Sequence, residues 1–454
     1  MVVKVFLFKF RQPISGSLIS HQLYPDFRFS NCLSPDHSFT NALAHLPYGR
    51  INGSQSYGDQ HIMISKQAIL AGHICLDIAP DFSSLEEGQF QRLFQPGRLL
   101  QTNTINLSTG GSVPNTGLSM HRLGVPVRLI GKIGTDLFGQ AVQDILRHES
   151  PHLAEDLVID LSLPTSATII INSSGFDRAF LHNPGANKAF YASDLRREIL
   201  QGADLFHFGY PPLMRSIYRG DGAELVSIFQ RARRAGLTTS LDFTLPDLSS
   251  PAGEADWPTI LANALPFVDL FVPSIEELAF LLDRDAFDRM CADKQHLFVE
   301  KVDPGLLDAL SEIVLSYGVK ALLVKLGHRG VYLRTASQLN WEKAGRGLEG
   351  LDDSWHERKI WAPAYQAAVR GTCGAGDAAI AGFLASILKG TNPETALKMA
   401  AAAGAISVES TIVHSGLKTW DEVWRRIQQG WETLTLDLSA QGWRKDQDLD
   451  LWTM

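Results

Sequence analysis

The sequence lacks several features that mark whole classes of protein. Its 454 residues include only four cysteines, Cys32, Cys75, Cys291 and Cys373, and no two of them form a CxxC pair. This scarcity argues against a structural zinc site and a disulfide scaffold, and it suits the reducing cytoplasm. The 14 histidines form no HExxH pattern, so we do not expect a catalytic zinc site.

Long hydrophobic runs and an excess of positive charge are also missing. No apolar run reaches the roughly 18 to 20 residues that span a bilayer, and the alanine-rich stretch 399–408 reads as a buried helix. The 41 basic and 49 acidic residues give a net charge of −8, so nucleic acid and anionic membranes exert no general attraction. Lysines interrupt the apolar start MVVKVFLFKF, which therefore does not predict a signal peptide. We expect a cytoplasmic protein without nucleic-acid or membrane partners.

The chain divides into three parts by composition. Residues 1–66 are rich in Ser, Asn, His, Gly and Tyr without a sustained period, which predicts a poorly ordered N-terminal extension. Met63 precedes the first strand pattern and is a candidate start. Residues 67–430 carry the folded pattern, and residues 431–454 form a polar C-terminal tail in which we find no signal.

Short β-branched runs alternate with amphipathic stretches from Ile69 onward. Examples are the strand patterns VPVRLIGKIG, TTSLDFT and KALLVKLG, with helical patterns between them. This alternation predicts an α/β fold: a mainly parallel, Rossmann-like sheet covered by helices on both faces. Residues 78–109 and 161–186 break the rhythm and predict strands outside the main sheet, either a small β lid or a plain edge hairpin.

The stretch GTCGAGDAAIAGF places a carboxylate on the first turn of an apolar helix, directly after a glycine loop. The N–H groups of Gly374, Ala375 and Gly376 can converge on an anion, and the positive end of the helix supports them. Asp377 then stands where a carboxylate could take the proton of a hydroxyl that attacks a phosphate. Taken alone, the motif is more typical of a simple helix cap.

A second glycine-rich stretch, GGSVPNTGLSMHRLGVPVRLIGKIGTDLFG, begins at Gly110. With both stretches in view, the chain resembles the pfkB carbohydrate kinases, or ribokinase-like family, over about residues 69–425. The resemblance implies a three-layer αβα fold with a small β lid. It also implies ATP-dependent phosphorylation of a hydroxyl on a sugar or sugar derivative, with Mg²⁺ as the metal.

The resemblance also implies roles for individual residues. Asp377 matches the catalytic base, and Gly374, Ala375 and Gly376 match the anion hole. The remaining matches are Asp77, Gly111, Asn115 and Asn187 for the substrate, Lys325, Gly327, Gly330 and Thr372 for the nucleotide, and Glu277 for Mg²⁺. Plainer interpretations stay open: a strand-end turn for Asp77, a helix cap for Asn115, a solvated helix position for Glu277 and a strand-end charge for Lys325.

Several positions depart from the family pattern. Gly371 replaces the aspartate that helps to bind a monovalent cation, so potassium dependence is in doubt. Ser274 replaces the asparagine of the NxxE motif, which puts the Mg²⁺ arrangement in doubt. Cys75 and Tyr210 replace ribose-binding residues of ribokinases and argue against ribose as the substrate.

Two further functions stay open at this point. The same scaffold serves nucleoside kinases, and a non-catalytic relative that binds a ligand or partner would also retain the fold. Homodimerisation through the lid strands is a further expectation from the resemblance.

Overall fold

The computed structural model describes residues 66–82, 96–97, 99, 101–171, 179–293, 296–341, 344–410 and 416–454. These residues belong to one compact unit, residues 61–454, which is described here by itself. The predicted N-terminal extension lies outside the described residues except for Lys66, whose ammonium donates to the carbonyls of Gly347 and Glu349. The predicted domain boundaries stay a prediction.

The main sheet has eleven strands in the order β14-β15-β13-β12-β11-β10-β9-β8-β1-β4-β5. Seven neighbouring strands, from β5 to β11, are parallel, and β12, β13, β15 and β14 continue the sheet antiparallel. The strands are β1 (Ala68–Gly72), β4 (Val127–Gly134), β5 (Val158–Asp160), β8 (Leu205–Gly209), β9 (Thr238–Leu241), β10 (Leu270–Phe271), β11 (Ala321–Lys325), β12 (Val331–Thr335), β13 (Lys359–Ala362), β14 (Arg444–Asp446) and β15 (Leu451–Thr453). The predicted mainly parallel sheet is confirmed.

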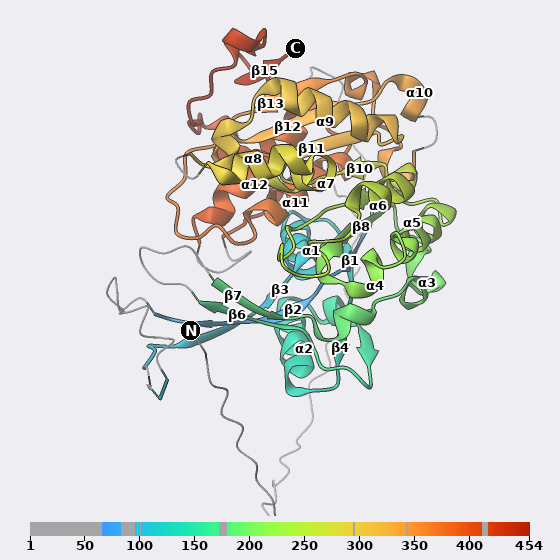
Figure 1. Cartoon of the computed structure of the whole chain (residues 1–454). Helices are drawn as coiled ribbons and strands as arrows, with labels where there is room; N and C mark the ends of the chain where they lie inside the picture. The colour runs from blue at the N-terminus through green and yellow to red at the C-terminus, as the bar shows by residue number, and fades with distance from the viewer. Residues whose placement is uncertain are drawn as a thin grey trace, which may run out of the picture. The chain divides into compact units, whose positions relative to one another are not determined.

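Helices cover both faces of this sheet (Figure 1). In β1, Ala68 and Leu70 belong to one hydrophobic core, whereas Ile69 and Ala71 belong to the other, as the two-residue period of a strand requires. The first core includes α1 (Ser112–Arg122), α2 (Leu137–Glu149), α11 (Ala375–Leu388), α12 (Pro393–Val408) and α13 (Trp420–Gln428). The second core includes α3 (Arg197–Leu200), α4 (Arg215–Tyr218), α5 (Ala223–Arg234), α6 (Trp257–Ala264), α7 (Ile275–Leu282), α8 (Arg284–Ala292) and α9 (Pro304–Ser316). The short helix α10 (Gln338–Trp341) follows β12.

A second, smaller sheet has the order β3-β2-β6-β7. Its strands are β2 (Cys75–Pro80), β3 (Ile105–Gly110), β6 (Ala167–Ile171) and β7 (Ala179–Asn183). All four fall within or next to the segments 78–109 and 161–186, for which the sequence predicts strands outside the main sheet. Only His73 and Ile74 separate β1 from β2, so the chain passes directly from the main sheet into the second one (Figure 1).

The C-terminal residues take part in the fold. Sequence analysis sets residues 431–454 apart as a polar tail, and within that range β14 and β15 extend the main sheet beyond β13. Trp443 and Trp452 are buried there in the second core. No helix among the described residues is both long enough and apolar enough to span a bilayer.

Candidate active site

The site lies where the carboxyl ends of the parallel strands meet the first turns of two helices. His73 follows β1, Tyr210 follows β8, Asp242 follows β9, and Lys325 ends β11. The helices are α1, which begins after the Gly110–Gly111 pair, and α11, which begins after Gly374. This is the edge of the sheet at which an open parallel α/β fold binds its ligands.

Asp377 is a buried carboxylate at this edge of the sheet. Among the described residues, no lysine or arginine forms an ion pair with it. It stands in the first turn of α11, and the residue is 3% exposed. Burial raises its pKa to about 7, and the negative charge of nearby Asp242 acts in the same direction. A carboxyl group with such a pKa can accept and release a proton near neutral pH.

Three donors hold the Asp377 carboxylate in place. Asn115 Nδ2 and Thr116 Oγ1, both on α1, lie 3.1 Å from Oδ2 and 3.2 Å from Oδ1. The Tyr210 hydroxyl donates to Oδ2 at 2.8 Å. Tyr210 adopts a left-handed backbone conformation with φ +65°, which is costly for a residue with a side chain.

A lysine side chain lies against Gly376 at the start of α11. A Cβ atom at Gly376 would lie 3.7 Å from Lys325 Nζ and 3.4 Å from its Cδ. The Lys325 ammonium therefore lies beside Gly376 of the GAG loop. A cation, a helix N-terminus and a glycine loop together form a site for phosphate.

The Lys325 ammonium also neutralises two buried acids. It lies 2.6 Å from Asp242 Oδ1 and 3.9 Å from Glu277 Oε2. Burial lowers the pKa of Lys325, but the two carboxylates outweigh burial and the net direction is upward. Burial raises the pKa of Glu277 to about 8, and the positive charge of Lys325 acts in the opposite direction.

Glu277 has a second, structural role at the start of α7. Its Oε2 accepts from the Ser274 N–H at 2.6 Å, and the Glu277 N–H donates to Ser274 Oγ at 3.2 Å. This reciprocal pair is a capping box, and serine makes it as asparagine would. The described residues contain no cluster of three or more metal-ligating side chains. Asp242 and Glu277 place two carboxyl groups beside Lys325, and proteins usually bind Mg²⁺ through one or two carboxylates together with phosphate oxygens.

Glycine is needed at positions 110 and 111 because two polar side chains occupy the space that a Cβ atom would take. A Cβ atom at Gly110 would lie 2.1 Å from Asp77 Oδ2, and one at Gly111 would lie 2.5 Å from His73 Nδ1. Asp77 also accepts from Cys75 Sγ at 3.2 Å, and burial raises its pKa to about 6. The plain strand-end turn considered for Asp77 does not describe this position, because its carboxylate lies within the second sheet opposite Ser108.

Comparisons with known proteins identify the family of the chain. A sequence model described as "pfkB family carbohydrate kinase" matches residues 74–420. The chain belongs to the pfkB family of carbohydrate kinases. It is similar to Fructokinase-2 of Oryza sativa subsp. japonica (25% identity, 48% of this chain and 60% of the relative) and to Probable fructokinase-4 of Arabidopsis thaliana (25%, 69% and 86%). The fold is also that of an Arabidopsis thaliana ribokinase solved with ribose and ATP, with a TM-score of 0.58 at 20% identity, over 80% of this chain and 98% of that chain.

Not every residue matched to the pfkB pattern lies beside Asp377 and Lys325. Asn187 is fully buried, and its amide bonds with both backbone groups of Ile74: the Ile74 N–H donates to Oδ1 at 3.3 Å, and Nδ2 donates to the Ile74 carbonyl at 2.7 Å. It thereby fixes the short link between the two sheets. Thr372 is exposed, and its carbonyl accepts from the Ala375 N–H at 3.4 Å.

The turn after β11 contains Gly327 and Gly330, which both have positive φ. A Cβ atom at Gly330 would lie 2.0 Å from the Ala362 carbonyl oxygen, so only glycine fits where this turn meets the end of β13. Gly371 forms a backbone hydrogen bond with the Val408 carbonyl at 3.2 Å and contributes no carboxylate at the place where the pfkB pattern has one.

Sequence analysis does not identify four residues of the site: Thr116, Asp242, His73 and His182. Asp242 had a usable signal, since an acid directly after the buried strand TTSL stands at the ligand-binding edge. Thr116 follows Asn115 on α1, and only the helix geometry turns both side chains toward Asp377. His73 and His182 carry no pattern that distinguishes them from buried core histidines.

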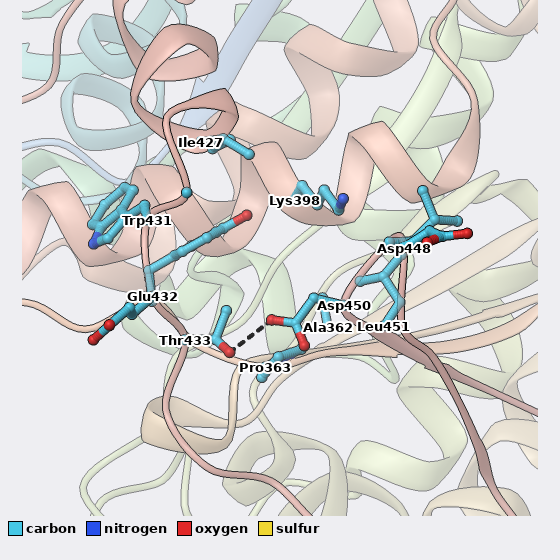
Figure 2. Close-up of a pocket in the computed structure, with 13 residues that line it drawn as sticks. Ala362, Pro363, Lys398, Ile427, Trp431, Glu432, Thr433, Asp448, Asp450 and Leu451 are labelled. Atoms are coloured by element: carbon cyan, nitrogen blue, oxygen red, sulfur yellow. Dashed lines mark hydrogen bonds between the residues drawn. The ribbon is translucent and has the colours of Figure 1, made fainter.

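A separate cavity of about 280 Å³ lies between β13, α12, α13 and the C-terminal residues (Figure 2). It shares no lining residue with the site around Asp377. Its acidic group Asp450 already accepts from Thr433 Oγ1 at 2.8 Å and pairs with Lys445 at 2.7 Å. Trp431 stacks on Tyr365 at the same place, with ring centroids 4.6 Å apart. We assign no chemistry to this cavity.

Proposed function

We propose that the protein transfers the γ-phosphoryl group of ATP to a hydroxyl group of a sugar or sugar derivative. The observation that carries the proposal is the Asp377 carboxylate, which is buried, has a pKa raised to about 7 and stands directly after the GAG loop at the start of α11. The relatives named fructokinase and the ribokinase solved with ribose and ATP support the same class of acceptor and donor.

In the proposed mechanism, Asp377 takes the proton of the acceptor hydroxyl. The acceptor oxygen then forms a bond to the γ-phosphorus, the bond from that phosphorus to the β–γ bridging oxygen breaks, and ADP leaves. The N–H groups of Gly374, Ala375 and Gly376, with the start of α11, stabilise the charge of the transferring group. Lys325 adds a positive charge beside Gly376.

Mg²⁺ would neutralise the phosphate oxygens of ATP when it is bound. Glu277 and Asp242 are the acids that could hold it, because both lie beside Lys325 at the phosphate side of the site. Gly327, Gly330 and Thr372 would line the nucleotide, whereas Asp77, Gly111 and Asn115 would contact the acceptor. Asn187 would act indirectly, by fixing the backbone of Ile74.

The test is ADP release from Mg-ATP with the full chain and a panel of neutral sugars, sugar acids and nucleosides. We expect one sugar or sugar derivative to stimulate ADP release and to appear as its phosphate ester. Stimulation by a nucleoside alone would replace the proposal with nucleoside phosphorylation. ATP binding without turnover on any acceptor would favour a non-catalytic relative.

We also propose that two copies of the chain associate through the second sheet, which then serves as a lid. Four apolar side chains are exposed on one face of this sheet, between 39% and 61%: Ile105, Leu107, Ile169 and Leu181. The register places Leu107, Ile169 and Leu181 in one cross-strand row with Ile78. Analytical ultracentrifugation should give a dimer that Leu107→Lys and Leu181→Lys convert to a monomer. A wild-type monomer at micromolar concentration would contradict the proposal.

A further inference from the structure

Two histidines face each other where the second sheet meets the main sheet. His73 follows β1, and His182 lies in β7, with ring centroids 5.0 Å apart. The His73 ring packs on Gly111, whose missing side chain leaves the room for it. On its other side, His73 lies 6.2 Å from the ring of Tyr210, the residue that donates to Asp377.

The ring nitrogens of this pair are left without protein partners. His73 is 1% exposed, and neither Nδ1 nor Nε2 has a hydrogen-bond partner among the described residues. His182 Nδ1 lies 3.0 Å from Thr168 Oγ1, whereas its buried Nε2 has none. Burying an unpaired polar group is unfavourable, and this pair of rings contains three such nitrogens. A bound molecule with several hydroxyl groups would supply the missing partners.

Polar side chains continue from the pair in both directions. Within the second sheet, Asp77, Thr168 and His182 lie opposite one another in one cross-strand row. Cys75 Sγ lies between the first two, 3.2 Å from Asp77 Oδ1 and 3.4 Å from Thr168 Oγ1. On the other side, the row leads through His73 and Tyr210 to the carboxylate of Asp377. The polar groups therefore form a wall that extends from the second sheet to the proposed base.

The charge of this wall favours an uncharged ligand. Burial lowers the pKa of both His73 and His182, and the neighbouring His182 lowers that of His73 further, so both rings are neutral at pH 7. A neutral imidazole offers one donor and one acceptor, as a hydroxyl group does. No lysine or arginine in the described part of the chain shifts the pKa of Asp77, so this acid would repel an anionic ligand.

We infer that His73 and His182 bind the hydroxyl groups of the acceptor and select a neutral polyhydroxyl compound over sugar acids and sugar phosphates. The inference rests on the proposed function, because it concerns the acceptor side of the same site. The two histidines are specificity-determining residues, while Asp377 remains the base.

The experiment compares wild type with His73→Phe and His182→Phe, which keep a ring but remove its nitrogens. His152→Phe is the matched control, since it removes one ring from the His121–His152 pair, whose centroids are 5.7 Å apart at the end of α1. His182→Asn restores part of the hydrogen bonding. Calorimetric titrations without ATP use D-fructose, D-ribose, D-gluconate, D-fructose 6-phosphate and adenosine as probes.

We expect a neutral sugar to bind most tightly. The two phenylalanine variants should raise its Kd at least about tenfold, which corresponds to one lost hydrogen bond of about 1.4 kcal/mol. The Kd of His182→Asn should lie between those of wild type and His182→Phe, and the Kd of His152→Phe should equal that of wild type. Tightest binding of gluconate or fructose 6-phosphate, equal binding by wild type and the phenylalanine variants, or no binding of either neutral sugar would overturn the inference.

ADP release separates this inference from the proposed function. If a neutral sugar binds through the histidines but no ADP forms, the proposed phosphoryl transfer is wrong and the inference about the histidines is retained. If ADP forms and the phenylalanine variants keep the acceptor KM of wild type, the inference about the histidines is wrong and the proposed phosphoryl transfer is retained.

Discussion

The hydrogen bond from Tyr210 to Asp377 should set the pH range in which the protein works. The substitution Tyr210→Phe removes one of three donors to the carboxylate and leaves the ring in place. The lost donor stabilises the charged form of Asp377, so its removal raises the pKa of the base. Because a base must be ionised to accept a proton, the acid limb of the kcat/KM profile should move to higher pH.

The size of the shift follows from the geometry. A hydrogen bond to a charged group contributes roughly 1.5–3 kcal/mol, and one pKa unit corresponds to about 1.4 kcal/mol. Asn115 Nδ2 remains on the same oxygen, Oδ2, so the lower value applies and the shift is about one unit. The pKa of Asp377 would rise from about 7 to about 8. At pH 7 the ionised fraction would fall from about half to about a tenth, so kcat/KM would drop roughly fivefold.

The assay is the pH dependence of kcat/KM from ADP release between pH 5.5 and 9.5, a range set about the pKa of near 7. The variant should recover most of the wild-type rate at pH 9. Tyr332→Phe is the control, because Tyr332 is a buried tyrosine whose hydroxyl donates to Asp308 at 3.4 Å, and neither residue belongs to the site. An acid limb that stays in place, or that moves to lower pH, would refute the reasoning.

Three further predictions concern stability and binding. Asp377→Asn should melt at a higher temperature than wild type at pH 8, and the difference should shrink toward pH 4. The reason is that the pKa of Asp377 is about 7 in the folded protein and about 3.9 in the unfolded chain. Ionisation of Asp377 therefore destabilises the folded wild type as the pH rises. An equal melting temperature at pH 8 would contradict this. Lys325→Met should destabilise the protein by about 3–5 kcal/mol in urea denaturation, because buried Asp242 loses its partner, and adding Asp242→Asn should restore part of the loss. Gly110→Ala should raise the acceptor KM at least tenfold with the ATP KM unchanged, because its methyl group would collide with Asp77; unchanged kinetics would count against that close contact.

Most of the fold can be predicted from the sequence because its strands and helices have distinct periods. The runs of β1, β8 and β11 are short and mostly apolar, as buried parallel strands are, and the segments that break the pattern form the second sheet. The strands β14 and β15 cannot be read in this way. Each has only three residues. Their place in the sheet depends on the pairing of β15 with β13, two strands that lie far apart in the sequence.

The site can be predicted only in part, for a related reason. Motif spacing identifies Asp377, Asn115 and the GAG loop, and the structure joins the first two by a hydrogen bond. Contacts between elements that are far apart in sequence determine the rest. Asp242 meets Lys325 only because β9, β10 and β11 are neighbours, and His73 meets His182 only because the second sheet folds beside β1.

The central claim is that Asp377 is the base of phosphoryl transfer to a sugar hydroxyl. The most direct test is single-turnover formation of the phosphorylated acceptor by wild type and Asp377→Asn, detected by mass spectrometry, with ATP and acceptor affinities measured on the same samples. We predict that the variant binds both ligands about as tightly as wild type and forms product at least about a hundredfold more slowly, as loss of a general base entails. An Asn variant that forms product at the wild-type rate would contradict the account.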